Sequence, residues 1–251
     1  MMITRAVVPT LFTVLNMFCG FLSIVHSSDG KFVEAAYLII LAGIFDSLDG
    51  VMARLTKSSS AFGVEIDSLS DVVSFGAAPA FLSYRLSLYQ MDVWGIIISS
   101  LLVILGAIRL ARFNVQLVGF DKEYFSGLPI PAAAIAVVSY VLTFMVDGSR
   151  LEGMAMSFFP FLVAVVSLIM VSTIKYDTLP KFSRKEIKKH PIRTISFFFS
   201  ALLILFTKGG AIFYLIAAFV LYGIGRHTVQ LFMHHPKTEE EEIEEVPSYD
   251  I

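Results

Sequence analysis

Long runs of apolar residues are the feature of this sequence that most limits what the chain can fold into. A helix that crosses a lipid bilayer needs about 20 mostly apolar residues. Eight runs approach that length, and they cover residues 8–26, 33–55, 62–83, 93–115, 130–146, 154–174, 194–207 and 211–224. Only 16 % of the 251 residues are charged, against about a quarter in soluble domains. The sequence therefore predicts an all-α, polytopic membrane helical bundle of about eight transmembrane helices.

The basic residues indicate how these helices are oriented. Lys and Arg are enriched in the cytoplasmic segments of membrane proteins. With the N-terminus inside, 15 of the 19 Lys and Arg residues fall in cytoplasmic segments, and seven of these lie in the loop 175–193. The sequence therefore predicts a multi-pass protein of the cell membrane with both termini and the segment 46–71 on the cytoplasmic side. We expect the basic loop to lie against anionic lipid headgroups rather than nucleic acid.

The chain is expected to hold one domain. No soluble domain fits between the apolar runs, so residues 1–237 are predicted to form a single integral membrane unit. Residues 238–251 contain seven acids and no base, which predicts a solvated, disordered tail. The single cysteine, Cys19, has no partner for an intramolecular disulfide and is expected to pack as a small apolar residue.

Five acidic residues lie within the second and third apolar runs: Asp46, Asp49, Glu65, Asp67 and Asp71. One ionised acid at the centre of a membrane helix costs about 2.5 to 3.5 kcal/mol, so this group needs compensation. Asp46 and Asp49 are three residues apart, and Asp67 and Asp71 are four apart, so each pair shares one helix face. Glu65 lies roughly 200° from Asp67 around the helix and is left out of the predicted site.

Small residues continue the two acidic faces. They are Ala42, Gly50 and Ala53 in the second run and Gly63, Ser70 and Ser74 in the third. Small side chains let helix backbones or a ligand approach closely. We therefore expect the two stripes to face each other across a site.

Four carboxylates that face one another repel, and a bound cation would relieve that repulsion. Oxygen ligands favour hard cations such as Mg²⁺ or Mn²⁺. Four carboxylates suit two ions, which can hold the attacking and leaving oxygens of a displacement at phosphorus. Two other interpretations stay open, namely interhelical salt bridges without metal and a cation-coupled transporter. Transporters usually place such sites between internal repeats, and the acidic motif is not repeated in this sequence.

The acidic segment resembles a known signature. Residues 46–71 follow the spacing D-x2-D-G-x2-A-R-x8-G-x3-D-x3-D, which is similar to that of the CDP-alcohol phosphotransferase family. The stretches DSLSDVVSFGAAPA, RLARFNVQ and FSGLPIPAAA, with the N-terminal TLFTVLNMFCGFLSI, resemble its membrane-bound phosphatidylserine synthase subfamily. The resemblance covers most of residues 8–135. It implies a helical membrane bundle that is typically homodimeric.

The resemblance also implies a reaction and roles for residues. CDP-diacylglycerol and L-serine would give phosphatidylserine and CMP. The residues implied to hold metal are Asp46, Asp49, Asp67 and Asp71, and Asp71 would also be the general base on the serine hydroxyl. The residues implied to bind the CDP-linked donor are Gly50, Ala53, Arg54, Ser60 and Gly63. For Ser60, a helix cap is the alternative role.

The alcohol is expected to bind near the cytoplasmic end of the fourth apolar run. Arg109 and Arg112 are three residues apart, Asn114 is close by, and an arginine suits the carboxylate of serine. Alternatively, these arginines contact lipid phosphates or stabilise the fold. Within the family, glycerol 3-phosphate or inositol phosphate as acceptor, and an archaeal ether-linked donor, stay open.

Overall fold

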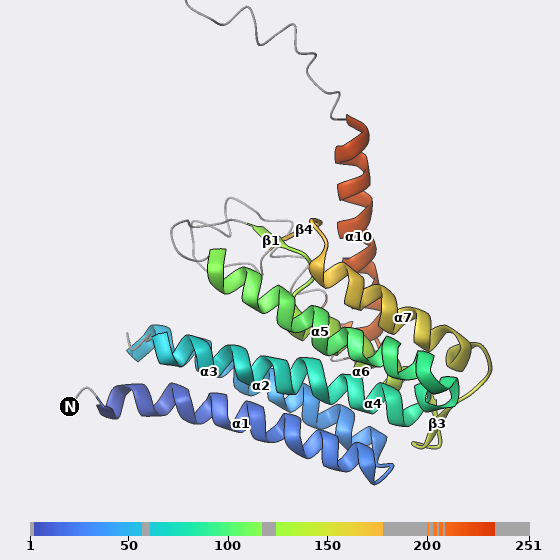
Figure 1. Ribbon diagram of the computed structural model, residues 1–251, viewed down its shortest axis with the longest axis horizontal. Coiled ribbons are helices and arrows are strands. Elements are labelled where there is room, and N and C mark those ends of the chain that lie inside the picture. Colours follow the sequence, from blue (N-terminus) through green and yellow to red (C-terminus); the bar gives the residue numbers. More distant parts are fainter. Residues whose placement is uncertain are drawn as a thin grey trace, which may run out of the picture.

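The computed structural model describes residues 3–56, 61–116, 124–177, 200, 203–204, 206–207 and 209–233. Long helices dominate this part of the chain (Figure 1). They are α1 (Ile3–Ser28), α2 (Phe32–Thr56), α3 (Ala61–Asp71), α4 (Ala78–Leu86), α5 (Asp92–Gln116), α6 (Ile130–Phe144), α7 (Gly153–Val171) and α10 (Ile212–Met233). A π-helical turn, η1 (Val72–Ala77), links α3 to α4, and a 3-10 turn, η2 (Leu88–Met91), links α4 to α5. The short strands are β1 (Tyr124–Ser126), β2 (Met145–Val146), β3 (Arg150–Leu151) and β4 (Lys175–Asp177).

Helices α1 and α2 form an antiparallel hairpin along one side of the bundle (Figure 1). The chain reverses at Gly30, whose φ of +77° is a conformation that glycine adopts without strain. The Lys31 N–H donates to the carbonyl of His26 at 2.9 Å, which satisfies a carbonyl at the end of α1. One turn before that end, the Ser23 hydroxyl donates to the Ala35 carbonyl at 2.9 Å. These contacts fix which residues of α1 lie beside which residues of α2 along the two helix axes.

Helices α3 and α4 continue into each other through the wider turn η1. A π-helical turn holds about one residue more than an α-helical turn and is frequent at functional sites. Phe75 in this turn is fully buried. At Gly76 the backbone comes close to α5, because an added Cβ would lie 3.5 Å from the Cα of Val103. The wide turn begins directly after Asp71, so it lies beside a predicted site residue.

Helix α5 packs against η1 and α4, and α6 packs against α2, η1 and α4, while α7 packs against α5 and α6, and α10 lies beside α6 (Figure 1). Aromatic side chains connect α6 with α7 and α10. The ring of Tyr140 on α6 lies 5.5 Å from that of Phe159 on α7 and 5.1 Å from that of Phe213 on α10. The Tyr140 hydroxyl donates to the carbonyl of Ala155 at 2.7 Å. A buried aromatic cluster of this kind contributes packing beyond its apolar area and holds three helices together.

An antiparallel pair of strands, β1 and β4, connects the segment after α5 to the segment after α7. Gly127 follows β1 with φ +80°, and an added Cβ there would lie 2.1 Å from the carbonyl oxygen of Met170. Its N–H donates to Ile174 O at 2.9 Å. Tyr176 on β4 is buried beside Phe219 of α10, and this burial raises the pKa of its phenol to about 12. The start of α6 is thus fixed against the end of α7.

The described residues confirm most of the predicted membrane helices. Helices α1, α2, α5, α7 and α10 contain five segments long and apolar enough to cross a bilayer. The predicted run 62–83 corresponds to α3, η1 and α4, and the predicted run 130–146 corresponds to the shorter apolar helix α6 followed by β2. The predicted run 194–207 lies mainly outside the described residues. A total of eight transmembrane helices therefore stays a prediction.

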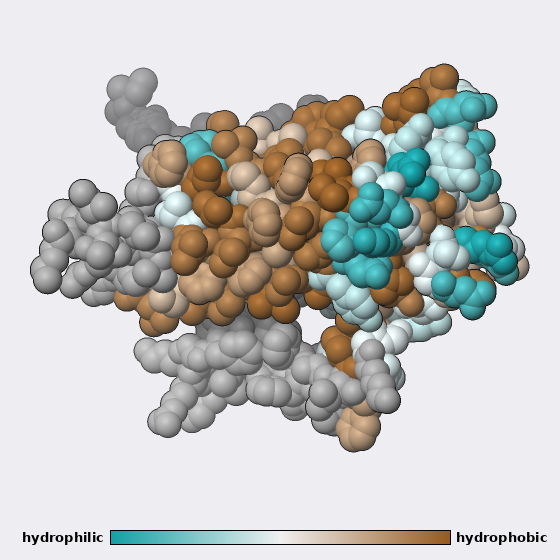
Figure 2. All heavy atoms as spheres, turned by 90° about the horizontal axis from the view of Figure 1, so that it is seen from below, coloured by the Kyte–Doolittle hydropathy of each residue, from teal (hydrophilic) through white to brown (hydrophobic). Residues whose placement is uncertain are grey.

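The surface of the described bundle is apolar over the helices. Figure 2 shows apolar residues across the middle of one face and hydrophilic residues gathered toward the end that carries the α1–α2 turn. Phe18, Phe21 and Ile44 are each more than half exposed. Soluble proteins rarely expose large contiguous apolar patches, so lipid is the expected surrounding. The predicted tail 238–251 and most of the basic loop 175–193 lie outside the described residues.

Replacing Gly20 by Ala is expected to destabilise the contact between α1 and η1. An added Cβ would lie 2.4 Å from Ser74 Oγ and 2.7 Å from its Cα, so the backbones must separate. Overpacking of this kind typically costs about 1–3 kcal/mol. The measurement is thermal unfolding of the purified protein in detergent. Gly225→Ala in α10 is the matched control, because no atom lies within 4 Å of its added Cβ. An unfolding midpoint for Gly20→Ala equal to that of the control would contradict this interpretation of the helix contact.

Candidate active site

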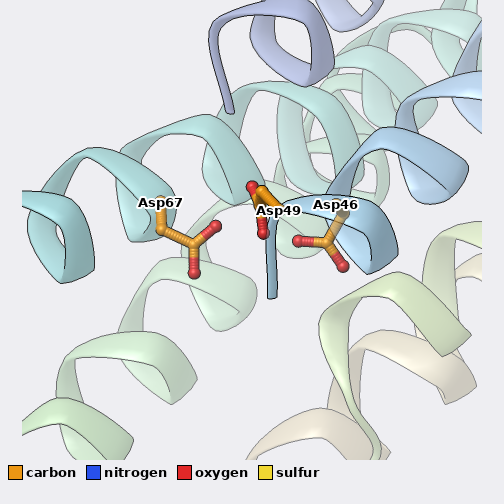
Figure 3. Close-up of side chains that lie close together, drawn as sticks. All are labelled: Asp46, Asp49 and Asp67. Carbon is orange, nitrogen blue, oxygen red and sulfur yellow. The ribbon is translucent and has the colours of Figure 1, made fainter. Parts of the chain in front are cut away.

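Three aspartates direct their carboxylates into one space between α2 and α3 (Figure 3). They are Asp46 and Asp49 of α2 and Asp67 of α3, and one oxygen from each lies within 4.8 Å of the others. Asp49 is buried, while Asp46 and Asp67 are half-buried. The structure thus brings together three of the four aspartates that the sequence assigns to one site, and it does so from two helices. Glu65, which helix geometry excludes, is exposed.

The fourth aspartate, Asp71, lies beside this group at the end of α3. Its side chain is 9 % exposed, and its carboxyl is within hydrogen-bond reach of Asp46. Arg109 on α5 is 5 % exposed and lies near enough to Asp71 for their charges to attract. Among the described residues, neither Asp71 Oδ1 nor Arg109 Nε has a hydrogen-bond partner. Buried polar atoms are normally paired, so these two atoms are available to form hydrogen bonds with a ligand.

Helix α1 holds α2 and α3 in place around the carboxylates. The Thr13 hydroxyl donates to Asp49 Oδ2 at 3.0 Å, and the Ser70 hydroxyl donates to the Thr13 carbonyl at 3.1 Å. One turn further along, the Ser74 hydroxyl donates to the Asn16 carbonyl at 2.9 Å. Ser70 and Ser74, which belong to the predicted stripe of small residues, are fully buried. The expectation that the two stripes of small residues face each other is therefore wrong for Ser70 and Ser74, which face α1. Asp67 of α3 nevertheless meets the carboxylates of α2.

The chemistry of these donor atoms fits a hard divalent cation. All the candidate ligand atoms are carboxylate oxygens, the type that Mg²⁺ and Mn²⁺ prefer. Asp67 Oδ1 is buried and has no hydrogen-bond partner among the described residues. A buried carboxylate oxygen without a partner costs free energy, and a cation would compensate that cost. The three aspartates, with Asp71 beside them, are thus a suitable metal site.

The predicted donor-binding residues are described only in part. Gly50 lies half-buried on α2, next to Asp49, and Gly63 lies half-buried near the start of α3. Ala53 and Arg54 belong to α2, but their side chains lie outside what the structure describes, and Ser60 falls in the undescribed segment 57–60. Their assignment to the donor stays a prediction.

The predicted alcohol-binding residues near the end of α5 contact two other elements. Arg112 Nη1 donates to the carbonyl of Val171 at the end of α7, at 3.1 Å. Asn114 Nδ2 donates to the Ser68 hydroxyl on α3 at 2.9 Å. Both side chains therefore also fix α5 relative to its neighbours. Arg109 lies near enough to Asp71 for their charges to interact.

The sequence segments that carried the resemblance meet in space. Ile130, which follows the GLP turn, places its Cδ1 atom 2.6 Å from an added Cβ at Gly106 on α5 and 3.8 Å from one at Gly76 in η1. The turn at Gly127 is in turn fixed to the end of α7. The contact of Ile130 with Gly76 thus brings two of these segments together. The hydrogen bond from Asn114 to Ser68 joins the third segment to them.

Two residues at the site were given no role from the sequence. Thr13 bonds Asp49, and Asn16 is fully buried one turn further along α1. A signal for them exists, because Thr13, Asn16 and Gly20 recur at helical spacing on one face of an otherwise apolar run.

Comparisons with known proteins agree with this geometry. Residues 6–169 match the family described as CDP-alcohol phosphatidyltransferase. The chain is 43 % identical over 175 residues to the CDP-diacylglycerol–serine O-phosphatidyltransferase of Helicobacter pylori strain ATCC 700392 / 26695, covering 69 % of this chain and 73 % of that protein. It is 33 % identical over 186 residues to the protein of the same name from Bacillus subtilis, covering 72 % and 96 %. It is also 44 % identical over 170 residues to the archaetidylserine synthase of Methanothermobacter thermautotrophicus, covering 67 % and 68 %.

Proposed function

Because this chain belongs to the CDP-alcohol phosphatidyltransferase family, we propose that it transfers the phosphatidyl group of CDP-diacylglycerol to the hydroxyl of L-serine. Family membership makes the chain a transferase, and it removes the support for a cation-coupled transporter. Relatives at up to 43 % identity that carry the name CDP-diacylglycerol–serine O-phosphatidyltransferase support serine as the acceptor. The observation that carries the proposal is the group of aspartates between α2 and α3, with buried Asp71 beside them.

The proposed reaction forms one phosphorus–oxygen bond and breaks another. The serine hydroxyl oxygen attacks the phosphorus that bears the diacylglycerol, while Asp71 takes the hydroxyl proton. CMP leaves with the electron pair of the bridging phosphorus–oxygen bond. A carboxylate within hydrogen-bond reach of a hydroxyl can act as its general base. Asp71 suits this role because it is buried and its Oδ1 has no partner among the described residues.

The aspartates Asp46, Asp49, Asp67 and Asp71 would hold two Mg²⁺ or Mn²⁺ ions. Bound there, the ions would neutralise the charge of the diphosphate and of the CMP that leaves. Thr13 keeps the Asp49 carboxylate in position through its 3.0 Å hydrogen bond. Arg54 would assist by binding the donor's phosphates, and Gly50, Ala53 and Gly63 would leave room for the nucleotide, with Ser60 nearby.

The carboxylate of serine would be bound by arginine. Arg109 is suited to this because it is buried, lies near Asp71 and has an Nε without a partner among the described residues. Arg112 and Asn114 would support it from the same end of α5. A guanidinium binds a carboxylate through charge-assisted hydrogen bonds, so this arrangement would place the serine hydroxyl beside its base.

The membrane supplies the setting for this chemistry. The apolar helices support a multi-pass membrane protein, and the excess of basic residues in alternate segments supports a cytoplasmic site with both termini inside. The diacylglycerol chains would stay in the bilayer while water-soluble serine reaches the aspartates from the cytoplasm. A homodimer is the expected assembly, from the resemblance to the family.

The acceptor is tested by a panel of alcohols. We expect purified protein with CDP-diacylglycerol and Mn²⁺ or Mg²⁺ to release CMP and form labelled phosphatidylserine when labelled serine is supplied. Glycerol 3-phosphate and inositol phosphate, offered in parallel, are expected to give no product. Reactions without an acceptor control for hydrolysis of the donor. Product with one of the phosphorylated alcohols and none with serine would overturn the proposal.

An ether-linked donor is the second candidate, because one relative at 44 % identity is named archaetidylserine synthase. The same assay distinguishes the two when an ether-linked CDP-archaeol replaces CDP-diacylglycerol. We expect higher kcat/KM with the diacyl donor. The reverse preference would assign the ether lipid as the natural donor and leave the chemistry of the aspartates unchanged.

A further inference from the structure

Asn16 on α1 is the one buried amide side chain in the described part of the chain. Its exposed fraction is 0 %. Among the residues that the structure describes, neither its Nδ2 nor its Oδ1 has a hydrogen-bond partner. A buried polar group left unpaired costs about 1–3 kcal/mol. An amide with both ends unpaired is therefore a candidate ligand-binding group.

The helix contacts place Asn16 at the level of the reacting groups. Thr13 is bonded to Asp49 and Ser70. Because α1 and α2 are antiparallel, one turn onward from Thr13 corresponds to one turn back from Asp49, which is the level of Asp46. On the other neighbour, the Asn16 carbonyl accepts from Ser74, which lies one turn beyond Ser70 and three residues after Asp71.

Four groups around the site have buried hydrogen-bonding atoms without a partner among the described residues: the Asn16 amide, Asp67 Oδ1, Asp71 Oδ1 and Arg109 Nε. An amide offers donors at one end and an acceptor at the other. An ionised phosphate of the donor substrate only accepts hydrogen bonds, so it would leave Asn16 Oδ1 unpaired. The ammonium group of an amino acid has three N–H donors and would satisfy Asn16 Oδ1. The Nδ2 atom of Asn16 would remain available for a neighbouring carboxylate.

We propose that Asn16 is a specificity-determining residue that binds the attacking amino acid, with its Oδ1 accepting from the ammonium group. This inference rests on the proposed function, because it assumes an amino-acid acceptor. Asn16 then distinguishes serine from alcohols that lack an ammonium group, while Arg109 holds the carboxylate and Asp71 faces the hydroxyl.

The test uses the full-length Asn16→Leu variant, which keeps the shape of the side chain and removes its polar atoms. We expect the KM for serine to rise about ten- to a hundredfold, as for loss of a hydrogen bond to a charged group. The KM for CDP-diacylglycerol should change less than twofold. The unfolding temperature should stay the same or rise, since an unpaired buried amide is replaced by an apolar group.

A second measurement uses inhibitors. The affinity of 3-hydroxypropanoate, which has the hydroxyl and carboxylate of serine but no ammonium, should be nearly equal for wild type and Asn16→Leu. Ser23→Ala, on the same face of α1 but at the Ala35 contact away from the site, controls for disturbance of the helix hairpin and should keep wild-type KM values.

The outcomes separate this inference from the proposed function. Wild-type protein that transfers nothing to serine would refute the function itself. Active wild type with an unchanged serine KM in Asn16→Leu would refute only the role of Asn16. A raised KM for CDP-diacylglycerol would assign Asn16 to the donor instead, and a variant that fails to fold would show a structural role; either result overturns the inference.

Discussion

Replacing Asp71 by Asn is expected to lower kcat by about a hundredfold to ten-thousandfold, the usual contribution of a general base. The change removes the proton acceptor but keeps the shape of the side chain. Asp71 is buried and lies within hydrogen-bond reach of Asp46, and an amide can still bond that neighbour. The fold and the binding of CDP-diacylglycerol should therefore be retained. The measurements are CMP release under saturating substrates, donor binding and the unfolding temperature.

Glu65→Gln is the matched control for this variant. It removes one negative charge from the same helix, but Glu65 is exposed and lies on another face of α3. Its turnover should equal that of wild type. Two results would contradict the role of Asp71 as base: full turnover of Asp71→Asn, or recovery of its turnover when the Mn²⁺ concentration is raised, which would show a loss of metal affinity alone.

Removal of divalent cations is expected to abolish CMP release, and Mg²⁺ or Mn²⁺ should restore it. The three carboxylates whose oxygens lie within 4.8 Å of one another repel unless a cation lies between them. Without the positive charge of the cation, the carboxylates would also repel the diphosphate of the donor. Ca²⁺ is larger and coordinates more loosely, so it should restore much less activity. The measurement is CMP release after treatment with a chelator and addition of each ion.

The chelated protein is expected to stay folded. Helices α1, α2 and α3 and the turn η1 are joined by the bonds from Thr13 to Asp49, from Ser70 to Thr13 and from Ser74 to Asn16. Two of these bonds do not involve a carboxylate. Circular dichroism before and after chelation checks this expectation. Activity that persists without divalent cations would contradict the two-metal site, and loss of helicity would show that the ions are structural.

The sequence predicted the helices well where apolar runs were long and uninterrupted. Hydropathy alone located α1, α2, α5, α7 and α10, because a bilayer demands a minimum apolar length. It could not predict that the third run would contain a π-helical turn, because no single residue type marks one. It also extended the fifth run over β2, since Met145 and Val146 are as apolar as the helix before them.

The acidic half of the site was predictable and the α1 half was not. Spacings of three and four residues place carboxylates on one face of a helix, and the structure brings Asp46, Asp49 and Asp67 together accordingly. Periodicity within one helix says nothing about which other helix covers that face. The roles of Thr13 and Asn16 depend on the antiparallel packing of α1 against α2, which is tertiary information.

The π-helical turn Val72–Ala77 determines how α3 is rotated about the helix axis relative to α4. An α-helix advances about 100° for each residue, and a π turn absorbs one residue more than an α turn. Deleting one residue in this turn would let α3, η1 and α4 form one regular α-helix. If α4 stayed packed as it is, α3 would rotate by about a quarter of a turn and carry Asp67 and Asp71 away from α2. The number of residues in the segment VVSFGA thus sets the rotation of α3 relative to α4, and this rotation aligns the aspartates of α3 with those of α2.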